Sequence, residues 1–167
     1  GGVDRPTSGK VYINGTDIFA MNDDELAIFR RRQVGIIYQF YNLIPILNVE
    51  ENMAIPMELD GRKVEKAQMD DMLFRLGLTE RRTHLPNELS GGQQQRTSIG
   101  RALITRPSIV LADEPTGNLD TKASNEIMHL LKTSNRELNQ TIIMITHNME
   151  LAKAADRTIM IEDGKIR

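Results

Sequence analysis

Two adjacent acidic residues, Asp113 and Glu114, directly follow the apolar run 109–112. Successive side chains at the end of a strand point to opposite sides, so two neighbouring carboxylates can take different tasks. One can enter the coordination shell of Mg²⁺ while the other faces an attacking water. Acidic residues at strand ends are common, however, and on its own such a pair more often indicates a helix cap or a solvated acid.

A second candidate site lies in the segment 89–96, which reads LSGGQQQR. Ser90 and Gln93 match a capping box and predict that a helix begins here. Gly91 and Gly92 would leave the first helical amides uncovered at the positive end of the helix dipole, where an anionic phosphate binds well. An isolated S-G-G more often indicates a flexible helix cap, but the full string is too specific for chance. Together with the paired acids, it indicates nucleotide chemistry.

These residues need a scaffold, and the second half of the sequence alternates between strand and helix patterns. We expect strands at 109–112, 141–146 and 158–161, and helices at 121–138 and 149–155. Such alternation predicts an α/β fold with a mainly parallel sheet covered by helices. Upstream we expect a hairpin at Asn14 and Gly15, a helix at 23–32 and a buried strand at 34–38.

The stretch from about 42 to 104 has a different texture and predicts a separate helical lobe. Its last helix begins at Ser90 and runs toward residue 103. Gly100 lies inside that helix, where a glycine costs ~1 kcal/mol relative to alanine. An earlier helix at 64–76 places four apolar residues on one face, namely Met69, Met72, Leu73 and Leu76.

The composition is that of one folded domain. The chain has 167 residues, a formal net charge of −2 and no cysteine, which excludes disulfide scaffolds and thiolate zinc sites. No apolar run approaches the ~20 residues of a membrane span, so a membrane role requires a partner. The dense basic cluster at 30–32 is better explained by favourable charge at a helix end than by nucleic-acid contact. Nucleic-acid binding is therefore not expected.

Five motifs in one order carry a resemblance to a known family. LSGGQ at 89–93 resembles the signature motif of ATP-binding-cassette (ABC) ATPases, and 109–115 resembles their Walker B strand. YQF at 38–40 resembles the Q-loop, GNLD at 117–120 the D-loop, and ITHN at 145–148 the segment with the switch histidine. The resemblance covers essentially the whole chain, from residue 1 to residue 167. It implies a P-loop-NTPase-like core at 1–41 and 105–167, with the helical lobe at about 42–104 inserted in it.

The resemblance implies a role for each residue at the strand ends. Asp113 and Gln39 would serve the Mg²⁺ shell, Glu114 would polarise the attacking water, and His147 would contact the γ-phosphate of ATP. Phosphoryl transfer of this kind relies mostly on positioning and charge stabilisation, with little covalent work by the protein. The implied activity is therefore ATP hydrolysis coupled to transport.

The resemblance also implies partners. Ser90, Gly91, Gly92 and Gln93 would close over ATP held by a second ATPase protomer, and Asp120 would link the two protomers of a head-to-tail dimer. The segment DEPTGNLD at 113–120 resembles the branch that serves lipoprotein release, macrolide export and antimicrobial-peptide resistance. Its members pair with a separate membrane permease, whose cytoplasmic helix docks between the helical lobe and the Q-loop. This implies a peripheral location at the cytoplasmic face of the bacterial inner membrane, with the permease as the sole membrane contact.

One family motif has no match in the sequence. No window fits the phosphate loop G-x-x-x-x-G-K-[ST], since Gly9 and Lys10 are followed by Val11. We expect the N-terminal strands and the phosphate loop of the family to be missing before Gly1. We therefore expect the chain by itself neither to bind ATP tightly nor to hydrolyse it. A sheet that lacks a central strand would also expose an edge and apolar faces.

Two other functions stay open on these residues. A naturally truncated chain would act as a non-catalytic interaction module that docks on a permease or an intact ATPase. A family member devoted to cell division is also compatible with the motifs. The DNA-repair members are excluded because they carry long coiled-coil insertions, for which the stretch 42–88 is too short.

Overall fold

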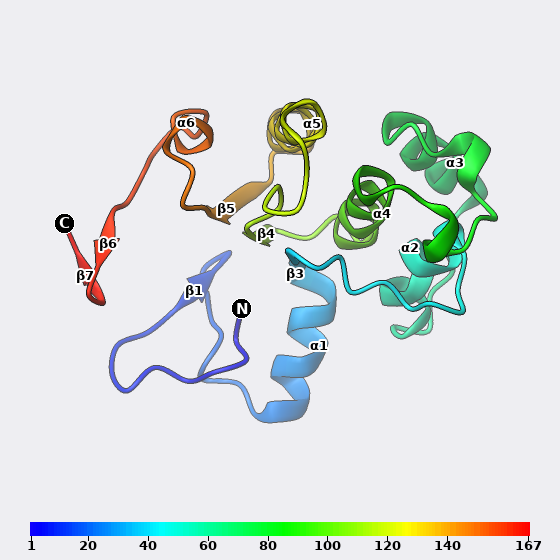
Figure 1. Cartoon of the computed structure of the whole chain (residues 1–167). Coiled ribbons are helices and arrows are strands. Elements are labelled where there is room, and N and C mark those ends of the chain that lie inside the picture. Colours follow the sequence, from blue (N-terminus) through cyan, green and yellow to red (C-terminus); the bar gives the residue numbers. More distant parts are fainter.

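A three-stranded parallel sheet forms the centre of the structure (Figure 1). The structure is a computed structural model that describes residues 1–167 with the exception of the Leu138 side chain. The strand order is β3 (Val34–Ile37), β4 (Ile109–Asp113) and β5 (Thr141–Ile145). The strands start level with one another, so their carboxyl ends lie at one edge. The predicted α/β fold with a parallel sheet is confirmed.

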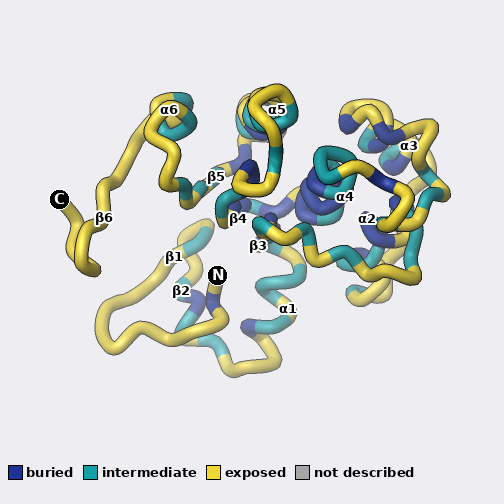
Figure 2. Tube along the Cα trace, viewed as in Figure 1, coloured by how far each residue is buried: buried dark blue, intermediate teal, exposed yellow. Residues whose placement is uncertain are grey.

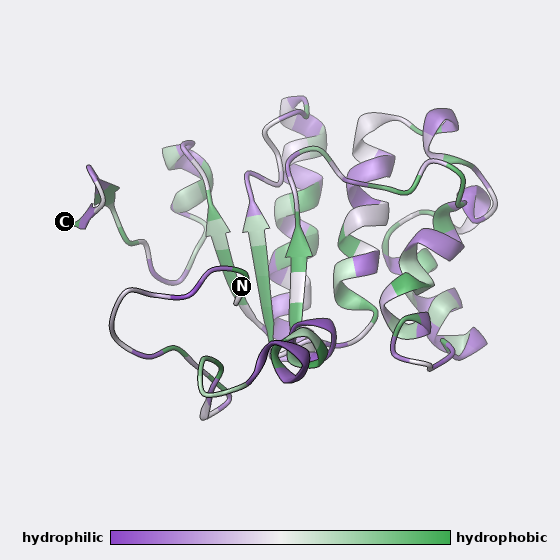
Figure 3. Ribbon diagram, turned by 90° about the horizontal axis from the view of Figure 1, so that it is seen from below, coloured by the Kyte–Doolittle hydropathy of each residue, from purple (hydrophilic) through white to green (hydrophobic). Residues whose placement is uncertain are grey.

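Helices cover both faces of this sheet. α4 (Gly91–Leu103) and α5 (Thr121–Leu138) lie on one face, and α1 (Asp23–Gln33) lies on the other (Figure 1). Viewed from the α1 side, the three strands run side by side and are largely apolar (Figure 3). None of the described helices combines the length and the apolar character that crossing a membrane requires.

The two faces of the sheet differ in burial. Ile37, Val110 and Ala112 alternate along their strands and are buried in the main core with α4 and α5. On the opposite face, Ile143 and Ile145 of β5 are exposed. Figure 2 shows that buried residues gather in α4 and the elements around it, whereas the C-terminal segment with β6 is exposed. In the described chain the outer edge of β5 pairs with no strand. The expected free edge and exposed apolar face are therefore both present.

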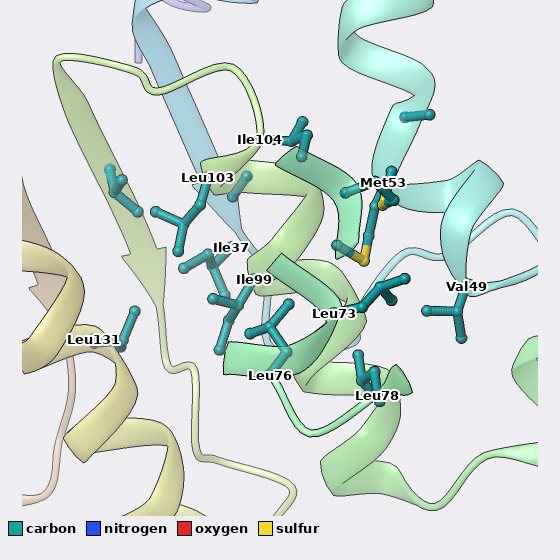
Figure 4. Close-up of a cluster of buried hydrophobic side chains, with 14 of the residues drawn as sticks. Ile37, Val49, Met53, Leu73, Leu76, Leu78, Ile99, Leu103, Ile104 and Leu131 are labelled. Carbon is teal, nitrogen blue, oxygen red and sulfur yellow. The ribbon is translucent and has the colours of Figure 1, made fainter. Parts of the chain in front are cut away.

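A group of short helices packs beside the sheet. It consists of α2 (Val49–Glu58), α3 (Lys66–Arg75) and the 3-10 turns η1 (Thr79–Arg81) and η2 (Pro86–Glu88). Helix α4 lies between this group and the sheet and contributes to both (Figure 1). Helices α2, α3 and α4 share one core, in which the following apolar side chains meet (Figure 4): Met53, Leu73, Leu76, Leu78, Ile99 and Leu103.

The apolar face predicted for the helix at 64–76 is largely confirmed. Met69, Leu73 and Leu76 are buried, and Met72 is partly buried against the same core. The helix itself begins at Lys66, two residues later than predicted, and Glu65 forms no side-chain hydrogen bond at its N-cap. The predicted start of α4 is confirmed in detail, since Ser90 caps that helix.

Gly100 has a packing role that helix propensity does not reveal. A methyl group at this position would lie 2.7 Å from Cδ1 of Leu76 and 2.7 Å from Cε of Met53. Glycine therefore lets α4 approach α2 and the end of α3 closely. An alanine would fit only if the ends of the buried Leu76 and Met53 side chains shifted, so Gly100 has a packing role in addition to its predicted cost in helix stability.

A second close approach joins α4 to the sheet. A methyl group at Gly35 would lie 2.5 Å from the carbonyl oxygen of Ala102 and 3.1 Å from Cγ of Pro107. The first obstacle is helix backbone and the second is a proline ring, and neither is a flexible chain end. The glycine at this position of β3 therefore sets the distance between the sheet and α4.

The N-terminal elements form as predicted. β1 (Tyr12–Ile13) and β2 (Thr16–Asp17) pair antiparallel across Asn14 and Gly15, which both have positive φ, 49° and 73°. This is the conformation that a two-residue hairpin turn requires. Helix α1 follows and starts at a capping box formed by Asn22 and Glu25, a signal that the sequence prediction had not used.

The arginine cluster at the end of α1 has specific partners. Arg32 donates from Nε to both carboxylate oxygens of Asp60, at 2.9 and 3.0 Å, and Arg31 donates to the carbonyl of Leu59. Arg30 donates to the carbonyl of Gly2 at 2.8 Å. Since Asp60 follows α2, these contacts tie α1 to the end of that helix. The cluster therefore makes specific structural contacts in addition to supplying the favourable charge predicted for the end of a helix.

The C-terminal segment departs from the prediction. α6 (Met149–Ala152) is shorter than the expected helix at 149–155. β6 (Ile161–Glu162) does not join the main sheet as the expected strand at 158–161 would, but pairs antiparallel with β7 (Lys165–Ile166). Asp163 and Gly164 both have positive φ, 50° and 73°, and turn the chain back on itself. This hairpin lies apart from β5 (Figure 1).

Candidate functional site at the carboxyl edge of the sheet

The residues predicted for catalysis gather at the carboxyl edge of the sheet. Gln39 follows the end of β3, Asp113 ends β4, Glu114 comes next, and His147 follows the end of β5. These strands are parallel neighbours, so the residues that follow them meet at one edge. This edge is where open α/β sheets bind their ligands.

Glu114 and His147 form a direct pair. Nδ1 of His147 lies 3.0 Å from Oε1 of Glu114. The Glu114 side chain is 28% exposed and that of His147 is 78% exposed, so the histidine lies on the solvent side of the pair. An imidazole that donates from Nδ1 to a carboxylate has its ring orientation fixed, and Nε2 stays available for another partner.

The backbone of Glu114 is unusual for a glutamate. Its φ is 41°, in the left-handed region, where a residue other than glycine carries strain of about 1–3 kcal/mol. Its amide donates to the carbonyl of Ile145 at 3.0 Å, and its carbonyl accepts from the amide of Gly117 at 2.9 Å. These two bonds stabilise a sharp turn directly after β4. Such strain is typical of residues that a functional site holds in place.

Gly117 lies between the two loops of the site. A methyl group here would lie 2.8 Å from Nε2 of Gln39 and 3.2 Å from Oε2 of Glu114. Only glycine therefore leaves both side chains where they are. Next to it, Nδ2 of Asn118 donates to the main-chain carbonyl of Gln39 at 3.0 Å. Asn118 belongs to the segment 117–120 that resembles the D-loop, but the sequence predicted no role for its side chain.

The donor set at this edge suits a magnesium ion held together with a phosphate. Asp113 supplies an exposed carboxylate and Gln39 an amide oxygen, which are hard ligands of the kind that Mg²⁺ prefers. Among the described residues, no group of three or more acidic or histidine side chains comes together. Magnesium sites with nucleotides use one or two carboxylates plus phosphate oxygens, so the residues present fit such an ion.

The signature residues form a separate group at the start of α4. Oγ of Ser90 accepts from the amide of Gln93 at 3.3 Å, and Oε1 of Gln93 accepts from the amide of Ser90 at 2.9 Å. A methyl group at Gly92 would meet only Cβ of Ala123, at 3.6 Å, which is ordinary contact. Packing therefore does not require a glycine at this position. The contacts described for this group do not include Glu114 or His147.

Asp120 lies at the start of α5. Its Oδ1 accepts from the amide of Ala123 at 2.8 Å, which caps the helix. This local role is sufficient to explain an aspartate here. Its predicted role in linking two protomers stays a prediction.

Gln95 joins the signature helix to the loop of Glu114. It is completely buried in α4, and its Nε2 donates to the carbonyl of Pro115 at 2.6 Å. The sequence prediction missed this residue. A signal was present, however, since Gln95 and Ile99 lie four residues apart on the same face of the helix, and a polar residue on a buried face needs a partner.

Comparisons with known proteins agree with the motifs in the sequence. The family model described as ABC transporter matches residues 2–117. The lipoprotein-releasing system ATP-binding protein LolD 1 of Chlorobium chlorochromatii is 43% identical over 169 residues, which cover 99% of this chain and 69% of that protein. The ABC transporter ATP-binding protein YtrE of Bacillus subtilis is 46% identical, with 97% of this chain and 71% of that protein covered.

A solved structure has the same fold. The ATP-binding cassette MJ0796, in a dimeric post-hydrolysis state bound to ADP and Pi, matches with a TM-score of 0.86 and 38% identity. The match covers 99% of this chain and 74% of that one. At this identity the likeness includes the sequence as well as the fold.

Proposed function

This chain belongs to the ABC transporter family of ATP-binding subunits, and from that premise we propose how its residues act. We propose that these residues, together with a phosphate loop, couple ATP hydrolysis in a head-to-tail dimer to the movement of a membrane permease. The observation that carries this proposal is the 3.0 Å contact between Glu114 and His147 at the carboxyl edge of the sheet.

The proposed catalytic work is divided between these two residues. Glu114 polarises the attacking water, and His147 holds the glutamate carboxylate through Nδ1 while Nε2 faces the γ-phosphate. The strained turn after β4 and the close fit around Gly117 support this assignment, because they fix the glutamate before substrate arrives. Positioning of this kind is the main contribution that phosphoryl transfer asks of a protein.

We propose that Asp113 and Gln39 hold Mg²⁺ when ATP is bound. The ion would supply charge neutralisation for the phosphate oxygens. Asn118 supports this arrangement, because its hydrogen bond to the Gln39 carbonyl fixes the loop from which the Gln39 side chain extends.

The signature residues act on a different nucleotide in this proposal. Ser90, Gly91, Gly92 and Gln93 would close over ATP bound to the opposing protomer. Two features support this. The group is separate from Glu114 and His147, and Gly92 stands at a helix start without a packing reason for a glycine. The dimeric state of the ATP-binding cassette MJ0796 agrees with such an arrangement.

The sequence contains no phosphate loop, and we propose that the chain by itself does not hold ATP tightly. The acids at the sheet edge are left without the lysine and amides that grip the β- and γ-phosphates. The signature group does not share this limitation, because its proposed nucleotide is bound by the partner. The chain should therefore assemble with an intact ATPase even if it cannot turn over ATP.

Both statements are tested with the purified chain and an intact ABC cassette that carries its own phosphate loop. Titration with labelled ATP should show no tight, Mg²⁺-dependent binding to the chain alone. Sedimentation velocity of the mixture should show a complex that requires ATP. Gly92→Ala should abolish the complex and keep the thermal stability, since its methyl group meets only ordinary contact. Tight binding by the chain alone, or no ATP-dependent complex, would contradict the proposal.

We propose that the permease docks beside the Q-loop. Phe40 and Ile46, which follow β3, are 72% and 81% exposed, and Tyr38 is also exposed. An apolar surface of this kind suits a short cytoplasmic helix of a membrane protein. The chain would then lie peripherally at the cytoplasmic face of a bacterial inner membrane. The relatives named lipoprotein-releasing system ATP-binding proteins support the lipoprotein-release branch, with the cargo chosen by the permease.

The second candidate function is a non-catalytic interaction module, which would need the signature group at the start of α4 but no hydrolysis at the sheet edge. Such a module would dock on a permease or on an intact ATPase and block it. Co-expression with the corresponding intact ATPase should then reduce transport. Unchanged transport at equal abundance would exclude this role.

A further inference from the structure

Arg101, near the end of α4, reaches across to the loop that follows β3. Its Nη1 donates to the carbonyl of Asn42 at 2.6 Å, and its Nη2 donates to the carbonyl of Tyr41 at 2.8 Å. The two acceptors are consecutive in the chain and lie about sixty positions before the arginine. One guanidinium therefore fixes two successive peptide groups of the loop that carries Gln39.

This loop needs an external support. Tyr41 and Asn42 both have positive φ, 58° and 47°, a conformation that side chains other than glycine adopt reluctantly. The amide of Asn42 donates back to Phe40 at 2.5 Å, which closes a very tight turn. The turn presents the carbonyls of Tyr41 and Asn42 to one guanidinium. Arginine suits this task, because its planar fork donates two N–H groups in fixed directions, whereas a lysine does not.

The surroundings of Arg101 fit a positioning role. Its side chain is partly buried, and this burial lowers the pKa of the guanidinium. The two carbonyls supply the hydrogen bonds that water would otherwise make. A side chain placed in this way acts by positioning the main-chain groups to which it donates.

The same loop also contacts the other end of α4. The Tyr41 hydroxyl lies 3.0 Å from the place where Gly91 would carry a methyl group. The loop therefore lies close to one helix at two points, near the signature residues and again at Arg101, where the guanidinium binds it. Asn118, in the loop after β4, also donates to the carbonyl of Gln39.

We infer that Arg101 is a positioning residue that ties the Q-loop to the signature helix, so that α4 and Gln39 move together. The inference rests on the proposed nucleotide site, in which the start of α4 and the Gln39 side chain act on two different ATP molecules. A shift of α4, produced when its first turn closes over one nucleotide, is then transmitted through the guanidinium to the loop that serves the other. The two sites of a dimer are coupled within each chain by this contact.

Hydrogen exchange on the chain without nucleotide tests the contact itself. In Arg101→Gln, the amides of Tyr41 and Asn42 should exchange at least about tenfold faster, while those of β4 stay unchanged. Arg101→Lys should give an intermediate rate, since one N–H group can still reach a carbonyl. The matched control is Arg96→Gln on the same helix, whose guanidinium pairs with Glu126 at 2.9 Å and does not contact the loop. It should leave both amides as they are.

Fluorescence tests the coupling. The chain contains no tryptophan, so Phe40→Trp, at an exposed position in the loop, provides a single reporter. Addition of an intact ABC cassette with Mg²⁺ and ATP should change the emission of the chain that keeps Arg101. The Arg101→Gln chain should still form the complex but show less than about a third of that change.

The outcomes distinguish the positioning role of Arg101 from the proposed function of the chain. Unchanged exchange in Arg101→Gln, or an equal fluorescence response in both complexes, overturns the positioning role. If Arg101→Gln is unfolded, Arg101→Lys decides, and wild-type exchange in that variant also overturns it. Failure of the complex in both chains contradicts the proposed function instead, while faster exchange in Arg101→Gln would still support the contact.

Discussion

Gly35→Ala is the sharpest test of how the sheet and α4 fit together. The added methyl group would lie 2.5 Å from the carbonyl oxygen of Ala102, and the ring of Pro107 blocks movement on another side at 3.1 Å. Overpacking of a core costs typically about 1–3 kcal/mol, and backbone obstacles belong at the upper end. Relief of the glycine entropy in a strand returns roughly 0.5–1 kcal/mol. We expect a net loss of about 2 kcal/mol.

Urea unfolding followed by far-ultraviolet circular dichroism measures this loss. With a slope of about 1–3 kcal/mol per molar urea, a loss of about 2 kcal/mol lowers the midpoint by roughly 1 M. The control is Gly92→Ala, whose methyl group meets Ala123 at an ordinary 3.6 Å and should leave the midpoint unchanged or raise it slightly. An unchanged midpoint for Gly35→Ala would show that α4 can move off β3. The described contact would then not set their separation.

Three further outcomes follow from described contacts. Asp120→Ala should cost about 1 kcal/mol in thermal unfolding, because it removes the cap on the Ala123 amide. Asp60→Asn should cost about 1–3 kcal/mol in urea unfolding, because its nearly buried carboxylate accepts two hydrogen bonds from Arg32. Burial raises the pKa of Tyr41 above 10.0, so the fold favours the neutral phenol. That stabilisation is complete below about pH 10 and is lost as the pH rises through the raised pKa, and thermal melts of Tyr41→Phe should lack this loss.

Local sequence patterns were sufficient to predict the elements that begin at a capping residue. α5 has the predicted bounds, and α4 starts at the predicted capping box of Ser90. The hairpin at Asn14 was equally local, since the turn depends on two residues that tolerate positive φ. The prediction of a strand at 158–161 in the main sheet was wrong, because the choice of a pairing partner is not a local property of the sequence. The turn at Asp163 offers a nearer partner than the sheet does.

The candidate site, like the fold, could be predicted from the sequence only in part. The motif residues could be named because five segments occur in a known order, and the parallel strands then bring Gln39, Glu114 and His147 to one edge. The partners of the residues that hold this edge could not be named. Gln95 and Arg101 act on main-chain carbonyls, and a carbonyl has no residue type by which sequence can recognise it. Only the fold shows which peptide groups face them.

The free edge of β5 has a consequence for the chain in solution. β5 and Thr146 form the six-residue stretch TIIMIT, which contains no charge, proline or glycine. Segments of this kind stack readily into cross-β assemblies when their backbone is accessible. Here the outer edge is unpaired, and Ile143 and Ile145 are exposed beside it. A strand from another molecule can add there by main-chain hydrogen bonds, so the concentration at which this chain stays dispersed depends on whether that edge is covered.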